Sequence, residues 1–139
     1  SSITINVQPS DTVSINYNST YCLNDINPFA NISGTPGGIF SITSPGVLTN
    51  TTTGEIDLTA SGTGSFFVYY STFNNNINCG DIDSVQITIL PDFSITTNDS
   101  ICQGDSILLG GIFQTSAGNY YDSLQTVNGC DSIIETILV

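Results

Sequence analysis

Ser84-Val85-Gln86-Ile87-Thr88-Ile89-Leu90-Pro91-Asp92-Phe93-Ser94-Ile95-Thr96 is the stretch that decides the fold. Polar and apolar residues alternate with a period of two up to Leu90, which indicates a half-buried β-strand. Pro91 ends that strand because proline cannot donate to a backbone ladder, and a second alternating run starts at Phe93. The sequence therefore predicts two β-modules, residues 1–91 and residues 92–139.

The same alternation extends outward from this boundary in both directions. It predicts strands at residues 2–7, 12–17, 38–42, 54–58, 65–73 and 84–90 of the first module, and at 93–97, 105–109, 112–114, 119–126 and 131–139 of the second. Clusters of Gly, Pro, Asn, Asp and Ser separate these runs, and no ten-residue window has the 3.6-residue period of a helix. Short strands at such regular spacing predict an all-β fold of the sandwich type.

The charge balance excludes several classes of partner. Lys, Arg and His are absent, while ten Asp and two Glu give a formal charge of -12. Without cationic side chains the chain cannot neutralise the phosphates of nucleic acid, and an anionic membrane surface would repel it. No intrachain salt bridge can form, so each carboxylate must be solvated, accept backbone N–H groups or bind a cation.

The two ends suggest an internal piece of a longer chain. Met is absent, no signal peptide opens the sequence, and no apolar run approaches the ~20 residues that span a bilayer. The last predicted strand runs to Val139 without a closing turn. We expect another module to follow it, and export and anchoring signals to lie elsewhere.

Four cysteines without any His indicate an oxidising compartment, since none of the cysteine spacings is the short one that zinc sites use. Pairing within each module predicts the disulfides Cys22–Cys79 and Cys102–Cys130. The loop-entropy model gives them roughly 4 and roughly 3.5 kcal/mol of stabilisation. Four reduced, buried thiols are the alternative.

Several segments resemble a known family. The first module is similar to the Ig-like and PKD-like repeats of large secreted proteins of the Bacteroidota in Asn27-Pro28, Ile32 to Phe40, Asn50 to Leu58 and Gly62 to Tyr70. The second resembles another repeat type of the same adhesin-like chains in Ile101 to Gly111, Gly118 to Leu124 and Asn128 to Ile133. The resemblance implies two tandem immunoglobulin-like β-sandwich modules, the second smaller, type IX secretion, and long repeat stalks for adhesion or gliding.

The most frequent short motif is Asp followed by Ser or Thr and then an apolar residue. Six of the ten aspartates begin it, whereas a chain with 36 Ser and Thr in 139 residues and 39% hydrophobic residues should contain about one. The motif resembles the O-glycosylation acceptor of the same bacterial group, which implies sugars on Thr12, Ser84, Ser100, Ser106, Ser123 and Ser132. Turn chemistry is the alternative, because an Asp that closes a turn before a strand gives the same triplet. Only exposed hydroxyls could accept a glycan.

Calcium is the one cofactor that the composition suggests, because it takes oxygen ligands and would offset the acidic charge. Asp81 and Asp83 are close in sequence, and Asp92 lies at the module junction. No EF-hand loop is present. Solvated turn aspartates are therefore the default expectation, and no other cofactor is predicted.

The residue inventory argues against catalysis. A serine nucleophile needs a general base, and neither His nor Lys is present. A pair of carboxylates could hydrolyse glycosides, but Glu55 and Glu135 fall in different modules. We predict that the chain is not an enzyme.

The sequence favours a structural and adhesive repeat of a long extracellular stalk or filament on a bacterial surface. Its partners would be neighbouring modules of the same chain or filament and an unknown surface or glycan ligand, without nucleic acid or direct membrane insertion. A carbohydrate-binding module is one alternative, since Phe66-Phe67, Tyr69-Tyr70 and Tyr120-Tyr121 each place one aromatic on either face of a strand. A self-assembling pilus-like subunit is another, if the strand ending at Val139 completes the sheet of the next copy.

Overall fold

The computed structural model describes residues 3, 5, 7–73, 79–125 and 129–139. Strands account for 52% of the chain, and the helix α1 (Leu58–Ser61) is a single turn, so the all-β class is confirmed. No helix in these ranges is long and apolar enough to cross a membrane. The chain divides into two compact units, Ser1–Leu90 (unit 1) and Pro91–Val139 (unit 2).

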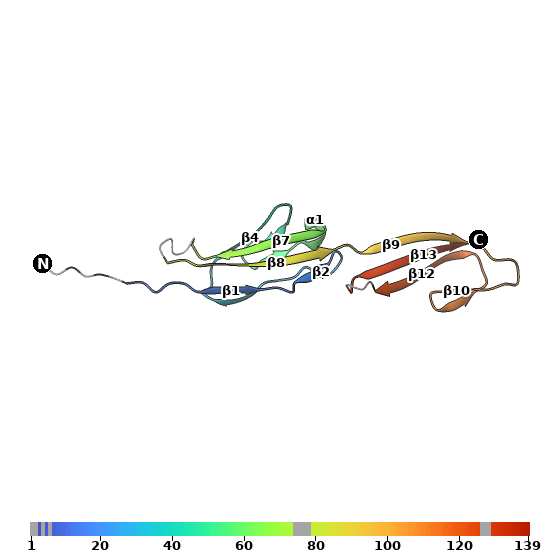
Figure 1. Ribbon diagram of the computed structural model, residues 1–139, viewed down its shortest axis with the longest axis horizontal. Coiled ribbons are helices and arrows are strands. Elements are labelled where there is room, and N and C mark those ends of the chain that lie inside the picture. Colours follow the sequence, from blue (N-terminus) through green and yellow to red (C-terminus); the bar gives the residue numbers. More distant parts are fainter. Residues whose placement is uncertain (1–2, 4, 6, 74–78, 126–128) are drawn as a thin grey trace. The chain divides into compact units, whose positions relative to one another are not determined.

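Unit 1 contains three sheets (Figure 1). Its strands are β1 (Val13–Asn16), β2 (Thr20–Cys22), β3 (Asn31–Gly34), β4 (Ile39–Ile42), β5 (Leu48–Asn50), β6 (Glu55–Ile56), β7 (Gly64–Ser71) and β8 (Ile82–Leu90). The largest sheet has the order β2-β8-β7-β4, and the two smaller ones are the antiparallel pairs β1-β3 and β5-β6. β7 is antiparallel to both of its neighbours, whereas β2 is parallel to β8.

The hydrophobic core of unit 1 lies against one face of the four-stranded sheet. Alternate residues of β7 and β8 are buried, and their neighbours point to solvent, as the period-two pattern predicts. A one-residue slip in pairing would turn the apolar residues to water, so burial fixes the register. One cluster contains Ile15, Tyr17, Tyr21, Phe40, Ile56, Leu58, Phe66, Val68, Tyr70, Ile87 and Ile89.

The first strands of unit 1 run parallel to its last strand. In the β2-β8 pair, Thr20 lies opposite Thr88. Further toward the start of the unit, the Asp11 N–H donates to the Cys79 carbonyl oxygen at 2.8 Å. Residues 11–22 therefore run alongside residues 79–90 in the same direction.

Two predicted strands differ from the structure. Residues 54–58 form the short strand β6 and then α1, because the Asp57 carboxylate accepts the Ala60 N–H at 2.9 Å and caps the helical turn. The predicted strand at residues 2–7 lies partly outside the described residues. Ile3, Ile5 and Val7, which are described, are not in a strand and are exposed.

Unit 2 contains a three-stranded sheet and a hairpin. Its strands are β9 (Phe93–Asp99), β10 (Ile107–Leu109), β11 (Ile112–Gln114), β12 (Gly118–Gln125) and β13 (Asp131–Leu138). The sheet order is β12-β13-β9, and β10 pairs with β11. β13 is antiparallel to β12 and parallel to β9 over seven residue pairs. The first and last strands of unit 2 are therefore parallel neighbours, as the second and last strands, β2 and β8, are in unit 1 (Figure 1). Residues 127 and 128 of the turn predicted at 127–130 lie outside the described residues.

The predicted disulfide Cys22–Cys79 is wrong. Cys79 lies level with Asp11 in the parallel register of unit 1, and Cys22 lies level with Leu90. These levels are eleven residues apart along the strands, about 36 Å at a rise of ~3.3 Å per residue. A disulfide needs Cα atoms within about 7 Å of each other.

The predicted disulfide Cys102–Cys130 is wrong for the same reason. Cys102 follows Ile101, whose N–H donates to the Val139 carbonyl oxygen at 3.4 Å, beyond the end of β13. Cys130 precedes the start of β13, nine residues from Val139, or about 30 Å along the strand. In the described part of the chain, Cys22 and Cys130 are disulfide-bonded, whereas Cys79 and Cys102 are free.

Candidate functional site

Two aspartates of unit 1 connect its last strand to its first. β1 pairs with β3 through its backbone. Two N–H groups of β1 bond to the aspartates: the Val13 N–H donates to Asp81 Oδ2 at 3.0 Å, and the Ile15 N–H donates to Asp83 Oδ2 at 2.8 Å. The second oxygen of each carboxylate accepts the N–H of the residue that follows the aspartate, at 2.9 and 2.8 Å. All four carboxylate oxygens therefore accept backbone N–H groups.

These carboxylates extend the parallel register of unit 1. The bonds from Val13 to Asp81 and from Ile15 to Asp83 both span 68 residues, as does the backbone bond from Asp11 to Cys79. Side-chain oxygens thus take the place of backbone carbonyls beside β1, whose ladder partner is β3. A hydrogen bond to a charged group contributes roughly 1.5–3 kcal/mol, so the two bonds hold the first strand firmly to the last.

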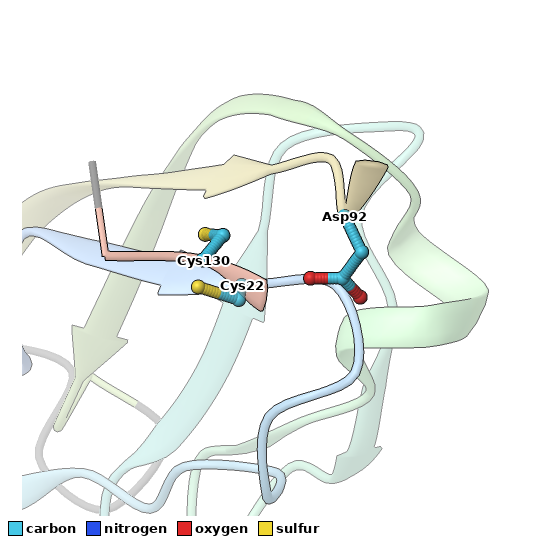
Figure 2. Close-up of side chains that lie close together, drawn as sticks. All are labelled: Cys22, Asp92 and Cys130. Carbon is cyan, nitrogen blue, oxygen red and sulfur yellow. The ribbon is translucent and has the colours of Figure 1, made fainter. Parts of the chain in front are cut away.

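The residues suggested for calcium do not form one cluster within a unit. Asp81 and Asp83 are engaged by β1, and Asp92 belongs to unit 2. Among the described residues, one group of metal-ligating types was found, Cys22, Asp92 and Cys130 (Figure 2). Because both cysteines are disulfide-bonded, they lack the thiolate that binds metal, and we assign no metal site to this group.

The interior of unit 1 contains tyrosine hydroxyls that bind the backbone. The Tyr17 hydroxyl donates to the Gly54 carbonyl oxygen, and the Tyr70 hydroxyl accepts the Gly38 N–H at 2.8 Å. No buried side-chain nitrogen or oxygen of the described residues lacks a hydrogen-bond partner. Burial strongly raises the pKa of Tyr17, with a smaller contribution from Tyr21. Burial also raises the pKa of Tyr21.

Five of the six predicted glycan acceptors are exposed. Ser132 is half-buried. The Ser123 hydroxyl donates to Asp131 Oδ1 at 2.7 Å. The exposed acceptors are Thr12, Ser84, Ser100, Ser106 and Ser123. Most of the predicted hydroxyls are thus accessible to a modifying enzyme.

The aspartates of the same motif have a local structural role. The carboxylates of Asp83, Asp99 and Asp131 each accept the N–H of the following serine, at 2.8, 2.8 and 3.1 Å. This bond stabilises the backbone where a strand begins or ends. These aspartates therefore have a role in the backbone structure that does not depend on glycosylation.

The two glutamates lie in separate units, Glu55 in unit 1 and Glu135 in unit 2. In unit 2, Glu135 Oε1 accepts the Tyr121 hydroxyl at 2.9 Å and the Asn119 side-chain amide at 3.0 Å. The Thr96 hydroxyl donates to Glu135 Oε2 at 3.3 Å. The Glu135 carboxylate raises the pKa of exposed Tyr121 by accepting its proton in a hydrogen bond and by its charge.

The aromatic pairs divide between the two faces of their strands, as the alternation predicts. Phe66 and Tyr70 are in the core, whereas Phe67 is 43% exposed and Tyr69 is half-buried. The ring centroids of Phe67 and Tyr69 are 6.4 Å apart, with an interplanar angle of 31°. Unit 1 therefore presents two neighbouring rings on the solvent face of its largest sheet.

Sequence reasoning missed the bonds from Asp81 and Asp83 to β1. The available signal was their shared spacing of two, which matches the spacing of Val13 and Ile15. That match has meaning only once the parallel pairing of the first and last strands is known. No family model and no curated protein matches this sequence.

Proposed function

We propose that the chain is a structural and adhesive repeat of a long extracellular stalk on a bacterial surface, and that it acts without catalysis. The observation that carries this proposal is that an early strand of each unit pairs in parallel with its last strand, β2 with β8 in unit 1 and β9 with β13 in unit 2. A chain that enters and leaves a unit along parallel neighbours enters at one end and leaves at the opposite end. Such units suit a linear array.

The same geometry suits resistance to tension. Pulling on a unit through its two ends draws the first and last strands in opposite directions along their length. The evenly spaced bonds of a parallel pair are then loaded together in shear instead of opening one at a time. Forced unfolding is governed by the barrier to unfolding, so this arrangement raises the force at which a unit opens.

The composition supports an extracellular location and separation between neighbouring chains. A charge of -12 without any cation produces repulsion between copies. The assignments to a bacterial surface and to type IX secretion rest on the sequence resemblance. The pilus-like alternative is less well supported, because β13 already pairs on both sides within unit 2 and is not free to complete the sheet of another copy.

Single-molecule pulling on the full chain with its disulfide reduced tests the proposal, because an intact disulfide keeps the residues that it encloses out of the loaded path. Each unit should unfold as a separate event, and the double variant Asp81→Ala, Asp83→Ala should lower the unfolding force of unit 1 but not that of unit 2. Asp57→Ala is the matched control, because it removes a carboxylate–N–H bond in α1 that does not join the first strand to the last. The control should lower the melting temperature without lowering the force.

Two results would contradict the proposal. One is unfolding of both units at forces no greater than those that open a hairpin from its ends. The other is an equal loss of force in the control and in the double variant, which would mean that general stability sets the force.

A further inference from the structure

We propose that the solvent face of β4, β7 and β8 in unit 1 is a binding site for neutral oligosaccharides. This inference specifies the adhesive part of the proposed function and rests on it. The three strands lie side by side (Figure 1), and their opposite face packs on the core. The solvent face is therefore held rigid by the best-packed part of the molecule.

The register places polar side chains on both sides of the two rings. Tyr69 lies between Ser41 of β4 and Ser84 of β8. Phe67 lies opposite Gln86, and its N–H donates to the Thr43 hydroxyl at 3.0 Å. Each aromatic ring thus has a hydroxyl or amide group beside it on either strand.

This combination fits the two surfaces of a sugar ring. A pyranose presents C–H groups on its faces, which pack on the electron-rich face of an aromatic ring. Its hydroxyls, around the edge, both donate and accept hydrogen bonds, as do the serine, threonine and glutamine side chains here. The 6.4 Å between the ring centroids of Phe67 and Tyr69 allows each ring to contact a different sugar of one chain.

The charge pattern selects a neutral ligand. No acidic residue occupies the positions around Phe67 and Tyr69, and the Asp83 carboxylate bonds to β1 on the core side of the sheet. A neutral glycan therefore meets no like charge on this face. An acidic glycan would meet a chain of charge -12 that offers no cation to pair with it.

A second copy of the chain fits the face less well. Each copy carries the same charge of -12, so association is opposed by repulsion. Stable homodimer interfaces also have an apolar centre, whereas hydroxyl and amide groups flank these two rings across the strands, and the exposed Ile39 and Ile82 lie toward one end of the face. We therefore commit to a sugar as the occupant.

Binding of oligosaccharides to the full chain tests the inference. The protein should come from a host that adds no O-glycan, because a sugar on Ser84 would sit beside Tyr69 and occupy the face. The probes are β-linked oligosaccharides of glucose, mannose and N-acetylglucosamine, with oligogalacturonate as the acidic comparison. Calorimetry should detect at least one neutral probe and no acidic one.

Three variants locate the site. Phe67→Thr and Tyr69→Thr should each weaken binding about tenfold, or about 1.4 kcal/mol, while Thr preserves the strand preference. Tyr121→Thr is the matched control, because it removes an exposed aromatic from a strand of unit 2 and should leave binding unchanged. If either unit 1 variant fails to fold, amide shift changes in the unmodified protein should still map to Phe67, Tyr69, Ser84 and Gln86.

Other outcomes would overturn the inference. These are no binding of any neutral probe, shift changes confined to other surfaces, an equal loss in Tyr121→Thr, or a Phe67-dependent self-association that no sugar disrupts. The stalk proposal is tested separately, because Phe67→Thr should leave the unfolding force of unit 1 intact. A chain that resists force but binds no sugar would reject the site alone.

Discussion

The two units share a strand arrangement but differ in what holds it. In unit 1, β2 runs parallel to the last strand, β8. In unit 2, the first strand, β9, runs parallel to the last strand, β13. Unit 1 buries eleven hydrophobic residues in one cluster. The described residues of unit 2 contain two, Cys130 and Leu138, and every residue of β9 is exposed. The backbone topology is therefore independent of the size of the core beneath it.

This difference indicates two modes of stabilisation. Unit 1 is specified by side-chain packing, because each buried ring or branched chain excludes other registers. Unit 2 depends more on backbone ladders, with seven parallel pairs on one side of β13 and eight antiparallel pairs on the other. A segment of about 50 residues buries too little surface for packing alone to stabilise it well.

Truncating an isoleucine at the centre of each sheet gives the largest expected contrast. Ile87 of β8 is fully buried, whereas Ile133 of β13 is 41% exposed. Ile87→Ala should destabilise unit 1 by roughly 2–5 kcal/mol, because it leaves a cavity in a packed core. Ile133→Ala should destabilise unit 2 by less than about 1 kcal/mol, since solvent already reaches the site.

Hydrogen exchange read by mass spectrometry would measure the opening free energy of each unit separately. Equal losses from the two substitutions would remove the contrast between a packed unit and a ladder-dependent one. A loss confined to the unit that carries each substitution would also establish that the units unfold independently.

Two glycines sharpen the same contrast with a smaller effect. Gly54 of unit 1 has φ +71°, and an added Cβ would lie 2.5 Å from the Tyr17 hydroxyl oxygen and 2.9 Å from Phe40 ring carbons. Gly111 of unit 2 has φ +76° with nothing within 4 Å of that position. Gly111→Ala should cost roughly 1–2 kcal/mol from backbone strain alone. Gly54→Ala should cost roughly 1–3 kcal/mol more, because it also overpacks the core.

Thermal melting of the two glycine variants provides the measurement. Similar melting shifts would mean that the interior around Tyr17 rearranges at no cost, contrary to a tightly packed unit 1. Since the two φ values are nearly equal, any excess loss in Gly54→Ala reports packing.

Sequence patterns predicted best where a strand has one buried face. Residues 84–90 alternate strictly and form most of β8, and residues 112–114 match β11. β2 and β3 were missed because three or four residues are too few to establish a period, and Asn31 to Gly34 are all exposed. Burial, which creates the pattern, is absent from β3.

The interactions between distant strands were beyond sequence patterns. Four cysteines allow three pairings, and spacing does not choose among them. The choice depended on which strands are parallel, since that arrangement puts Cys22 and Cys79 at opposite levels of unit 1. Alternation predicted that one aromatic of each adjacent pair faces solvent, and the structure identifies these as Phe67 and Tyr121.

Buried and exposed tyrosines should respond differently to alkali. The pKa of Tyr17 is raised by burial, so the folded state binds this proton more tightly than the unfolded state does. The stability from this group is complete below about pH 10, the ordinary tyrosine pKa, and falls as the pH rises above it. Unit 1 should therefore lose stability above about pH 10, and Tyr17→Phe should weaken this dependence.

Denaturant midpoints for unit 1 measured at several pH values would check the prediction. Tyr17→Phe itself should cost about 1 kcal/mol near neutral pH, because the Gly54 carbonyl loses its donor. A midpoint that stays constant above pH 10 would mean that Tyr17 ionises without unfolding, as an exposed tyrosine does.

Ionisation of Tyr121 in unit 2 should have the smallest effect on stability, in contrast to ionisation of Tyr17. Its pKa is raised by the hydrogen bond to Glu135 and by the charge of that carboxylate, while the Asn119 side chain lowers it slightly. Glu135→Gln should therefore lower the Tyr121 pKa, and Asn119→Ala should raise it by a smaller amount. Because Tyr121 is exposed, added salt should screen the charge contribution, and ionisation should leave unit 2 folded.

An NMR titration of the Tyr121 ring would measure all three effects on its pKa, from Glu135→Gln, from Asn119→Ala and from salt. A Tyr121 pKa that is unchanged in Glu135→Gln would mean that the carboxylate and the phenol do not meet in solution, and that the sheet of unit 2 is looser than its ladders imply.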